Sequence, residues 1–159
     1  MFTIIAAVGR NRELGKSGGL VFRLPSDLQF FKKITTGAKV FMGKRTFESL
    51  PKKLPNRQHL VLADVDFPVD EDVEIVRDLD EFARTHKDTD EEIFVIGGGS
   101  VYAQMLPHAQ KMYLTEVDGA DKDADVFFPE FDKSEWSSET VGKGEDYGVA
   151  YRHVLYQRK

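Results

Sequence analysis

Short apolar runs along this chain alternate with segments in which apolar residues recur at helical spacing. The first run, 2–8, is apolar at nearly every position, which is typical of a strand covered on both faces. The glycine-bearing stretch 9–19 predicts a loop. A helix is predicted to begin at Leu24-Pro25-Ser26-Asp27, because Pro and Ser suit a helix start. Apolar residues follow there at helical spacing, namely Leu28, Phe31 and Ile34.

The rest of the pattern predicts strands alternating with short helices. Strands are predicted at 39–42, 59–63, 73–76, 92–96 and 111–117, and helices at 46–50, 79–85 and 100–106. The tail predicts an antiparallel hairpin from 137–141 and 148–157. This alternation favours an α/β fold with an open, largely parallel twisted sheet, flanking helices and an antiparallel C-terminal edge. Ligands of such sheets bind at the carboxyl ends of the strands.

Composition narrows the class of protein. The 159 residues contain no repeat or long linker, so we expect a single domain over 1–159. The chain shows no membrane-spanning run or signal peptide, and we expect a cytoplasmic monomer. The net charge of −5 argues against nucleic-acid or membrane partners. Cysteine is absent, which excludes disulfides and thiolate chemistry. The histidines lack metal-ligand spacing, so we expect no metal and surface or edge positions for His59, His86, His108 and His153.

Asp27 lies in the first turn of the predicted helix, on the face that also carries Phe31 and Ile34. One interpretation is an aspartate that merely stabilises the helix dipole. The other is a carboxylate on an apolar wall that binds paired N–H groups of a ligand, because a buried carboxylate is costly unless it is hydrogen-bonded. A flat heterocycle with an amidine-like edge would supply two parallel hydrogen bonds. The spacing alone leaves both interpretations open.

Two strand–helix turns have features of anion-binding sites. Gly43-Lys44-Arg45-Thr46 puts two cations at a helix start, where they oppose the macrodipole unless an anion binds there; solvated side chains are the alternative. Gly97-Gly98-Gly99-Ser100 allows close approach of a ligand, with a tight turn as the alternative. Together the two turns predict a ligand with more than one phosphate. Arg57, in a loop before a strand, is a candidate for bidentate carboxylate binding.

These residues together resemble the dihydrofolate reductase family, through nearly the whole chain. The matching segments are Ile5-Ala6-Ala7, Leu24-Pro25-Ser26-Asp27-Leu28 with Phe31-Lys32, Met42-Gly43-Lys44-Arg45-Thr46-Phe47-Glu48-Ser49, Leu54-Pro55-Asn56-Arg57, Ile96-Gly97-Gly98-Gly99-Ser100-Val101-Tyr102, Tyr113-Leu114-Thr115 and Asp125-Val126-Phe127-Phe128-Pro129. The order and spacing of these segments carry the resemblance more than any one of them.

The resemblance implies reduction of 7,8-dihydrofolate to tetrahydrofolate, in support of one-carbon metabolism. Asp27, aided by Thr115, would hold the 2-amino group and N3 of the pterin, and Arg57 would bind the carboxylate of the glutamate tail. Hydride would pass from the nicotinamide to pterin C6 while N5 gains a proton through water. Catalytic roles are thereby implied for Asp27, Phe22 and Leu20, and substrate contacts for Ile5, Ala6, Ala7, Leu28, Phe31, Leu50, Leu54 and Ile96.

The resemblance also implies NADPH as the cofactor and a cis Gly97–Gly98 peptide. The cofactor-binding residues would be Ala7, Leu14, Gly15, Gly43, Lys44, Arg45, Thr46, Leu62, Ala63, Asp64, Arg77, Ile96, Gly97, Gly98, Gly99, Ser100, Val101 and Tyr102. Asp64 stands where the family commonly has hydroxyl or basic residues near the 2′-phosphate, and its charge would favour NADH. Lys44, Arg45 and Arg77 favour NADPH by charge, and we expect NADPH.

The loop 14–20 would serve as a lid over the nicotinamide, braced by the loop of Asp125. Val21-Phe22 replaces the Pro-Trp that is usual in the family, and phenylalanine cannot donate the indole hydrogen bond. Two other functions remain open at this point. One is a reductase of the same fold that acts on a related heterocycle, such as a ribosylaminopyrimidine, although Arg57 and Thr115 favour folate. The other is a noncatalytic pterin- or nucleotide-binding protein, which Phe22 alone suggests.

Overall fold

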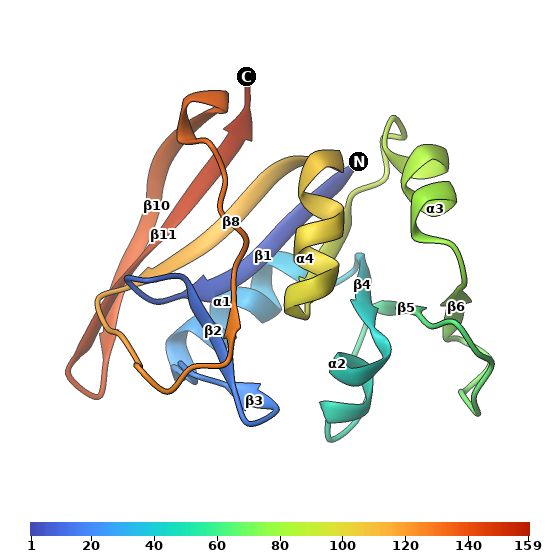
Figure 1. The fold of residues 1–159 in the computed structure, drawn as a ribbon, viewed down its shortest axis with the longest axis horizontal. Helices are drawn as coiled ribbons and strands as arrows, with labels where there is room; N and C mark the ends of the chain where they lie inside the picture. The colour runs from blue at the N-terminus through green and yellow to red at the C-terminus, as the bar shows by residue number, and fades with distance from the viewer.

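An eight-stranded sheet in the order β10-β11-β8-β1-β7-β4-β5-β6 forms the centre of the computed structural model, which describes residues 1–159 (Figure 1). Its strands are β1 Phe2–Val8, β4 Lys39–Gly43, β5 Gln58–Leu62, β6 Glu74–Val76, β7 Ile93–Gly97, β8 Ala109–Val117, β10 Trp136–Asp146 and β11 Val149–Arg158. The strands from β8 to β6 are mutually parallel, while β11 runs antiparallel to both β8 and β10. The predicted α/β sheet with an antiparallel C-terminal edge is therefore confirmed.

Helices cover both faces of this sheet. They are α1 Pro25–Thr35, α2 Lys44–Ser49, α3 Leu79–His86 and α4 Gly99–Met105, with short 3₁₀ turns at Leu106–His108 and Lys133–Glu135. The helix predicted at 46–50 begins instead at Lys44, directly after β4, so the two cations do lie in its first turn. None of the helices has the length and apolarity that a bilayer crossing requires.

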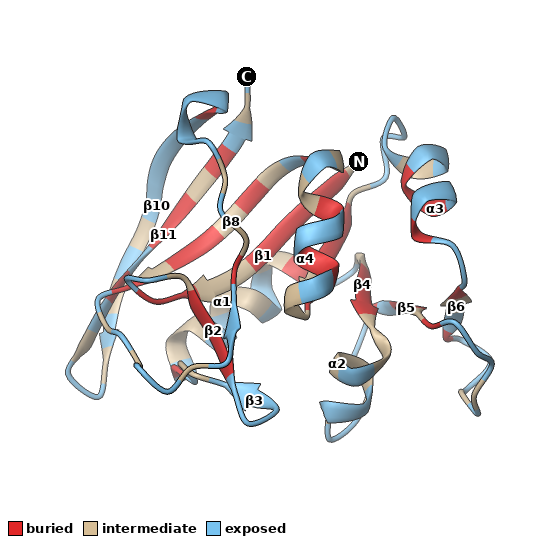
Figure 2. Cartoon of the chain, viewed as in Figure 1, coloured by how far each residue is buried: buried red, intermediate tan, exposed pale blue.

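Two apolar clusters lie on opposite faces of the sheet. Residues alternate between the two faces along each strand. On β1, Phe2, Ile4 and Val8 join the larger cluster under α3 and α4, whereas Ile5 joins the smaller cluster under α1 and α2. The buried residues accordingly follow β1, β8 and the inner side of α4 (Figure 2). The odd-numbered face of β1 is thus the one that meets α1.

The stretch 9–19, predicted to be a loop, contains two short strands, and this prediction was wrong. β2 (Glu13–Lys16) pairs with β3 (Gly19–Leu20) and with β9 (Val126–Phe127) in a second, three-stranded sheet. Strands of two to four residues with several glycines carry no readable alternation. Glu13 is buried here. Burial alone would raise the pKa of Glu13, but hydrogen bonds from nearby backbone N–H groups lower it below the ordinary value.

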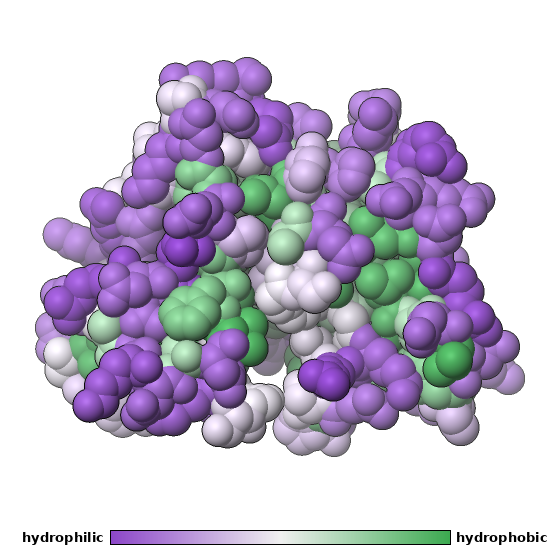
Figure 3. All heavy atoms as spheres, viewed as in Figure 1, coloured by the Kyte–Doolittle hydropathy of each residue, from purple (hydrophilic) through white to green (hydrophobic).

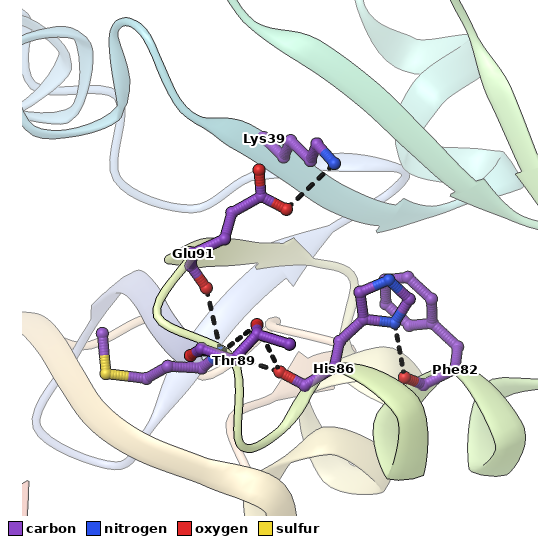
Figure 4. A network of polar contacts seen from close by, with 6 residues as sticks. Lys39, Phe82, His86, Thr89 and Glu91 are labelled. Carbon is purple, nitrogen blue, oxygen red and sulfur yellow. Dashed lines mark hydrogen bonds and ion pairs between the residues drawn. The ribbon is translucent and has the colours of Figure 1, made fainter.

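The amino group of Met1 ties the start of β1 to the segment that joins α3 to β7. It donates to the backbone oxygens of His86, Thr89 and Glu91 at 2.8, 3.0 and 2.9 Å. Figure 4 shows these acceptors, together with the ion pair between Glu91 and Lys39 of β4 at 2.9 Å. Because β1, β7 and β4 are adjacent strands, these contacts hold the amino ends of the strands together, and the carboxyl ends then meet at the opposite edge.

Two of the four histidines contradict the predicted surface or edge positions. His59 and His153 are both buried in the interior. His59 Nε2 accepts a hydrogen bond from the backbone N–H of Leu54 at 3.0 Å, and burial lowers the pKa of His59. His153 contacts Thr115 on the neighbouring strand. A histidine can occupy such places because a ring nitrogen of each finds a hydrogen-bond partner, which sequence spacing does not reveal.

Candidate active site

Asp27 projects from the first turn of α1 toward the odd-numbered face of β8. Its side chain is only 13% exposed, so it does not point into bulk water. The hydroxyl of Thr115 donates a hydrogen bond to Asp27 Oδ1 at 2.6 Å. Stabilisation of the helix dipole is therefore not the only role of this carboxylate, because Thr115, which is distant in sequence, also binds it. Asp27 and Thr115, predicted to act together, are in direct contact.

The electrostatic environment of Asp27 differs from that of a surface aspartate. Burial raises its pKa above the ordinary value, and the negative charge of Asp146 adds to this. The hydrogen bond from Thr115 and the proximity of His153 act in the opposite direction. A carboxylate of this kind is costly to keep ionised unless a ligand donates further hydrogen bonds to it. The site is suited to a ligand that presents several N–H groups.

Apolar residues form walls beside Asp27 on the same face of the sheet. Ala7 pairs with Thr115 across β1 and β8, and Ile5 lies one alternation earlier. The side chains of Phe31, Leu50, Leu54 and Ile96 pack against the same cluster as Ile5. The space-filling view shows the surface indented between the β2–β3 hairpin and α2, with apolar atoms beside the indentation (Figure 3).

Two of the predicted wall residues are placed differently. Ala6 packs against the cluster on the opposite face, so only its backbone can face Asp27. Leu28 of α1 is 39% exposed and is not part of the cluster that contains Ile5. Their roles as substrate contacts stay predictions.

Arg57 is a buried cation held in one orientation. Its Nε donates to the backbone oxygen of Pro55 at 2.9 Å and its Nη1 donates to Thr35 Oγ1 at 3.1 Å. The guanidinium carbon lies 5.9 Å from the centroid of the Phe31 ring. Burial lowers the pKa of Arg57, and no carboxylate of the chain lies within ion-pair distance of it. A buried guanidinium with donors to spare is ready to receive an external carboxylate.

The two glycine-bearing turns meet at the carboxyl edge of the sheet. A Cβ at Gly43 would lie 3.2 Å from Val101 Cγ2, and a Cβ at Gly98 would lie 3.4 Å from Thr46 Oγ1, so each turn contacts the helix that follows the other. Neither α2 nor α4 has a side-chain cap at its start. The first-turn N–H groups of both helices are thus without side-chain acceptors, as an anion site requires. The Gly97–Gly98 peptide is cis, as the resemblance implied.

Three predicted cofactor residues have side chains that are packed inside the fold. Tyr102 is buried against Gly97, and its hydroxyl donates to the backbone oxygen of Ile5 at 2.8 Å. Val101 is also buried, and Leu14 of β2 belongs to the larger apolar cluster. Their side chains are engaged within the protein. Any contact of these three residues with a dinucleotide would have to come mainly from the backbone.

Some of the charged residues expected near a 2′-phosphate already form ion pairs within the chain. Arg77 forms an ion pair with Asp66 and donates to the backbone oxygen of Asp64 at 3.0 Å. Lys44 lies 3.8 Å from Glu48, one helical turn later. Arg45 is exposed and forms no ion pair within the chain, and Asp64 is exposed as well. Of the three cations that favour NADPH, only Arg45 is therefore free of an ion pair within the chain.

The hairpin of β2 and β3 carries the predicted lid. The backbone N–H of Ser17 donates to Asp125 Oδ2 at 3.0 Å, and the backbone N–H of Asp125 donates to the oxygen of Gly15 at 3.0 Å. Leu20 on β3 is 50% exposed. The ring of Phe22 packs over Gly9 and Gly119, beside the small cluster of Leu24, Val117 and Tyr151. The catalytic roles given to Leu20 and Phe22 stay predictions.

A separate hollow of about 1000 Å³ contains none of the predicted site residues. It lies beside the ends of β1, β8 and β11 and the segment 128–133. Three arginines that line it each pair with a carboxylate of the chain, in the pairs Arg10–Asp118, Arg12–Glu130 and Arg152–Glu116. Size alone does not make it the active site, because the buried carboxylate, the buried guanidinium and the glycine turns all lie elsewhere.

Comparison with known proteins places the same residues in a family. The model of the dihydrofolate reductase family matches residues 1–158. The chain belongs to the dihydrofolate reductase family. It is 37% identical to a dihydrofolate reductase of Bacillus subtilis (strain 168), covering 100% of this chain and 95% of the relative. It is 35% identical to dihydrofolate reductase HdrB of Haloferax volcanii, covering 99% and 84%.

A solved structure shows the same fold. Dihydrofolate reductase from Enterococcus faecalis, complexed with NADP(H) and RAB-propyl, superimposes with a TM-score of 0.88 at 29% identity, covering 100% of this chain and 96% of that one. The sequence analysis of this dihydrofolate reductase family chain did not predict one residue of the site, His153. The only signal available was its alternation with Tyr151 along β11, and that does not give the register that sets it opposite Thr115.

Proposed function

We propose that this protein reduces 7,8-dihydrofolate to 5,6,7,8-tetrahydrofolate with NADPH. The contact between the largely buried side chain of Asp27 and Thr115 is the observation that carries the proposal. The ionised carboxylate accepts hydrogen bonds from the 2-amino group and N3 of the pterin, and the apolar walls around it exclude water from the ring. Two parallel hydrogen bonds to one carboxylate set the orientation of a flat ring as well as its affinity.

Arg57 supports a folate over a smaller heterocycle. A free pterin or a ribosylaminopyrimidine has no carboxylate to offer a buried guanidinium, whereas the glutamate tail of folate has one. Because the Arg57 fork is already oriented by Pro55 and Thr35, it loses little side-chain entropy when it binds. The distance between the pterin end and the tail end of the site then selects substrates with both groups.

The residues at the carboxyl edge fit a dinucleotide. The uncapped starts of α2 and α4 supply N–H groups, Arg45 supplies a free positive charge, and the missing side chain at Gly99 lets Val126 of β9 pack directly against the start of α4. When bound, NADPH supplies the hydride for the reaction. The lid hairpin shields this region from water while Asp125 holds it.

Water delivers the proton to the pterin, and the negative charge of Asp27 favours the protonated form. Asp27 contacts the pyrimidine edge of the pterin, too far along the ring to protonate N5 directly. Its negative charge stabilises the protonated pterin electrostatically, and a water molecule brings the proton. The overall reaction balances as one hydride and one proton added across the C6–N5 bond. We also propose that the chain acts as one domain, which the eight-stranded sheet supports because it joins strands from both ends of the chain. A cytoplasmic monomer remains part of the same proposal.

The direct test mixes the purified protein with dihydrofolate and NADPH and follows the absorbance of the reduced nicotinamide. We expect its decay to match tetrahydrofolate formation one to one. Dihydropteroate, which lacks the glutamate tail, should be reduced with a higher KM. Binding of both ligands without turnover would contradict the proposal and would point to a noncatalytic binding protein. Turnover of a ribosylaminopyrimidine in place of dihydrofolate would also contradict it.

A further inference from the structure

His153 stands directly behind the Thr115–Asp27 pair. It lies on β11 opposite Thr115 in the antiparallel register with β8, and its side chain is 8% exposed. Its Nδ1 is 2.9 Å from Thr115 Oγ1 and 3.7 Å from Asp27 Oδ1. The three side chains therefore form a line of polar contacts that joins β11, β8 and α1.

The direction of these hydrogen bonds follows from counting protons. The Thr115 hydroxyl has one proton, and it is donated to Asp27. An ionised carboxylate has no proton to return, so the hydroxyl oxygen can only accept from His153. Nδ1 must then carry a hydrogen, both in the neutral ring and in the protonated ring. The chain of donation runs from His153 through Thr115 to Asp27.

Neighbouring residues fix the orientation of the imidazole ring of His153. It stacks on Phe30 of α1, with ring centroids 3.7 Å apart and an interplanar angle of 8°. On β10, Gly142 leaves space for it, because a Cβ there would lie 3.3 Å from His153 Cδ2. The Tyr151 ring lies 5.1 Å away on the same strand. The plane of the ring, and with it the direction of Nδ1, is thus fixed from two sides.

We propose that His153 is a positioning residue, which orients the Thr115 hydroxyl so that its hydrogen bond holds the Asp27 carboxylate ionised and directed at the pterin. This inference rests on the proposed function, since it explains how the substrate-binding carboxylate is prepared. An aromatic residue without a donor would pack in the same place but would leave the hydroxyl free to turn. The donor at position 153 is therefore the part that matters.

Other charged and titratable groups lie around this line of contacts and shift the pKa values of Asp27 and His153. Asp146 of β10 accepts hydrogen bonds from the backbone N–H and the hydroxyl of Ser26, and its charge raises the pKa of Asp27. The Ser26 hydroxyl also contacts the Tyr151 hydroxyl. Burial lowers the pKa of His153, while the charge of Asp27 raises it. Since Nδ1 keeps its hydrogen when the ring loses its charge, the positioning role persists at neutral pH.

Three variants separate the donor from the ring. His153→Phe keeps the stack on Phe30 and removes the donor. His153→Asn places its amide near the position of Nδ1, and His153→Gln places it near Nε2. We expect H153F and H153Q to lower kcat/KM for dihydrofolate about fivefold at neutral pH. We also expect them to raise the midpoint of the acid limb of the pH profile, and H153N to restore both values toward those of the wild type.

A purely structural role would give a different ranking. If packing alone mattered, H153F would match the wild type, with an unchanged pH profile, and H153N would be the impaired variant; that result would overturn the proposal. Thermal unfolding of each variant, with and without NADPH, shows which of them fold. Should H153F fail to fold, H153Q against H153N still compares two amides of similar polarity that differ in the position of the donor.

Two measurements test the inference without turnover, so that it can be told apart from the proposed function. Nitrogen NMR of the wild-type protein should show His153 as the neutral Nδ1–H tautomer, which is the minor form in water. A carbon NMR titration of Asp27 should show a higher pKa in H153F than in the wild type. An Nε2–H tautomer, or an unchanged Asp27 titration, would overturn the inference. Failure of wild-type turnover alone would instead count against the proposed function.

Discussion

The backbone N–H of Ser17 donates a hydrogen bond to Asp125 Oδ2, with 3.0 Å between the two atoms. This contact joins the tip of the β2–β3 hairpin to the loop before β9. Asp125→Ala should loosen the tip, because the Asp125 N–H then contacts only Gly15 near the base of the hairpin, and the Lys16 ion pairs with Asp121 and Asp123, at 3.5 and 3.9 Å, are solvent-accessible and weak. A hydrogen bond to an exposed carboxylate contributes about 1 kcal/mol, so the closed population and kcat should fall about fivefold.

Steady-state rates with saturating NADPH measure this effect. Asp123→Ala is the matched control, because the Asp123 carboxylate lies in the same acidic loop and contacts only Lys16, at 3.9 Å. It should leave kcat nearly unchanged. Equal losses in the two variants would mean that the charge of the loop matters, rather than the bond to Ser17.

Asp27→Asn should lower turnover on the order of 100-fold or more at neutral pH, because the amide cannot stabilise the protonated pterin electrostatically. In acid, protons from solvent protonate the pterin directly, so part of the rate should return. The measurement is kcat across pH for both proteins. Full activity of the variant across the whole range would remove Asp27 from the mechanism.

Asp27→Asn should raise the free energy of unfolding, although it lowers turnover. Because the folded-state pKa of Asp27 is raised above the ordinary 3.8, the native protein binds this proton more tightly than the unfolded chain. The free energy of unfolding therefore falls as pH rises through the interval between the unfolded and folded pKa values, and this loss persists at neutral pH. D27N lacks that loss, and a gain of about 1 kcal/mol would raise Tm by roughly 3 °C. Calorimetry at pH 7 and in acid measures it, and the Tm difference should shrink in acid.

The contact between Asp27 and Thr115 shows how much of the site could be predicted. The sequence predicts a helix at Asp27 and a buried strand at Thr115, since capping and apolar spacing are local signals. The two residues are 88 positions apart, and composition and spacing alone did not bring them together. The resemblance to a family supplied that pairing.

His153 shows what neither source supplied. Its burial depends on the register of β11 against β8 and on the ring of Phe30, and both are tertiary features. The hairpin of β2 and β3 was missed for another reason. Its strands are very short, and the buried charge of Glu13 resembles a loop residue until the backbone donors from Asn11 and Asp121 are seen. Local patterns therefore predicted the central sheet and missed the smaller one.

Gly99→Ala should destabilise the protein through Val126. A Cβ at position 99 would lie 2.6 Å from Val126 Cγ1, which is too close for two carbon atoms. Val126 belongs to β9, so the strain should push the lid sheet away from α4, at a cost of about 1–2 kcal/mol in the free energy of unfolding. Val126→Ala alone should cost less, because Val126 is partly exposed.

Urea unfolding of the two single variants and the double variant forms a thermodynamic cycle. The double variant should be more stable than the sum of the single effects predicts, since the clashing methyl groups are gone. Strict additivity would mean that the cost of G99A comes from the backbone of the turn and not from Val126.

Arg57→Lys should raise the KM for dihydrofolate about tenfold and leave kcat within about twofold, since an ammonium cannot reproduce the planar fork held by Pro55 and Thr35. Dihydropteroate serves as the internal control, because it lacks the glutamate carboxylate. With that substrate, the wild type and the variant should have the same KM. A loss of similar size with both substrates would show that Arg57 supports the fold rather than the tail of the substrate.

Asp64→Asn should increase the preference of the enzyme for NADPH over NADH. Asp64 is exposed beside Arg77, and Arg77 is held by the backbone of residue 64 and by Asp66, so a phosphate at this place meets an unbalanced carboxylate. Two exposed charges about 4 Å apart interact by about 1 kcal/mol in water, so the KM for NADPH should fall about fivefold while that for NADH stays the same. Asp70→Asn is the control, because it removes the same charge from a carboxylate that pairs with Lys53. If both variants lower the KM for NADPH equally, the net charge of the protein sets the preference, and Asp64 has no specific part in it.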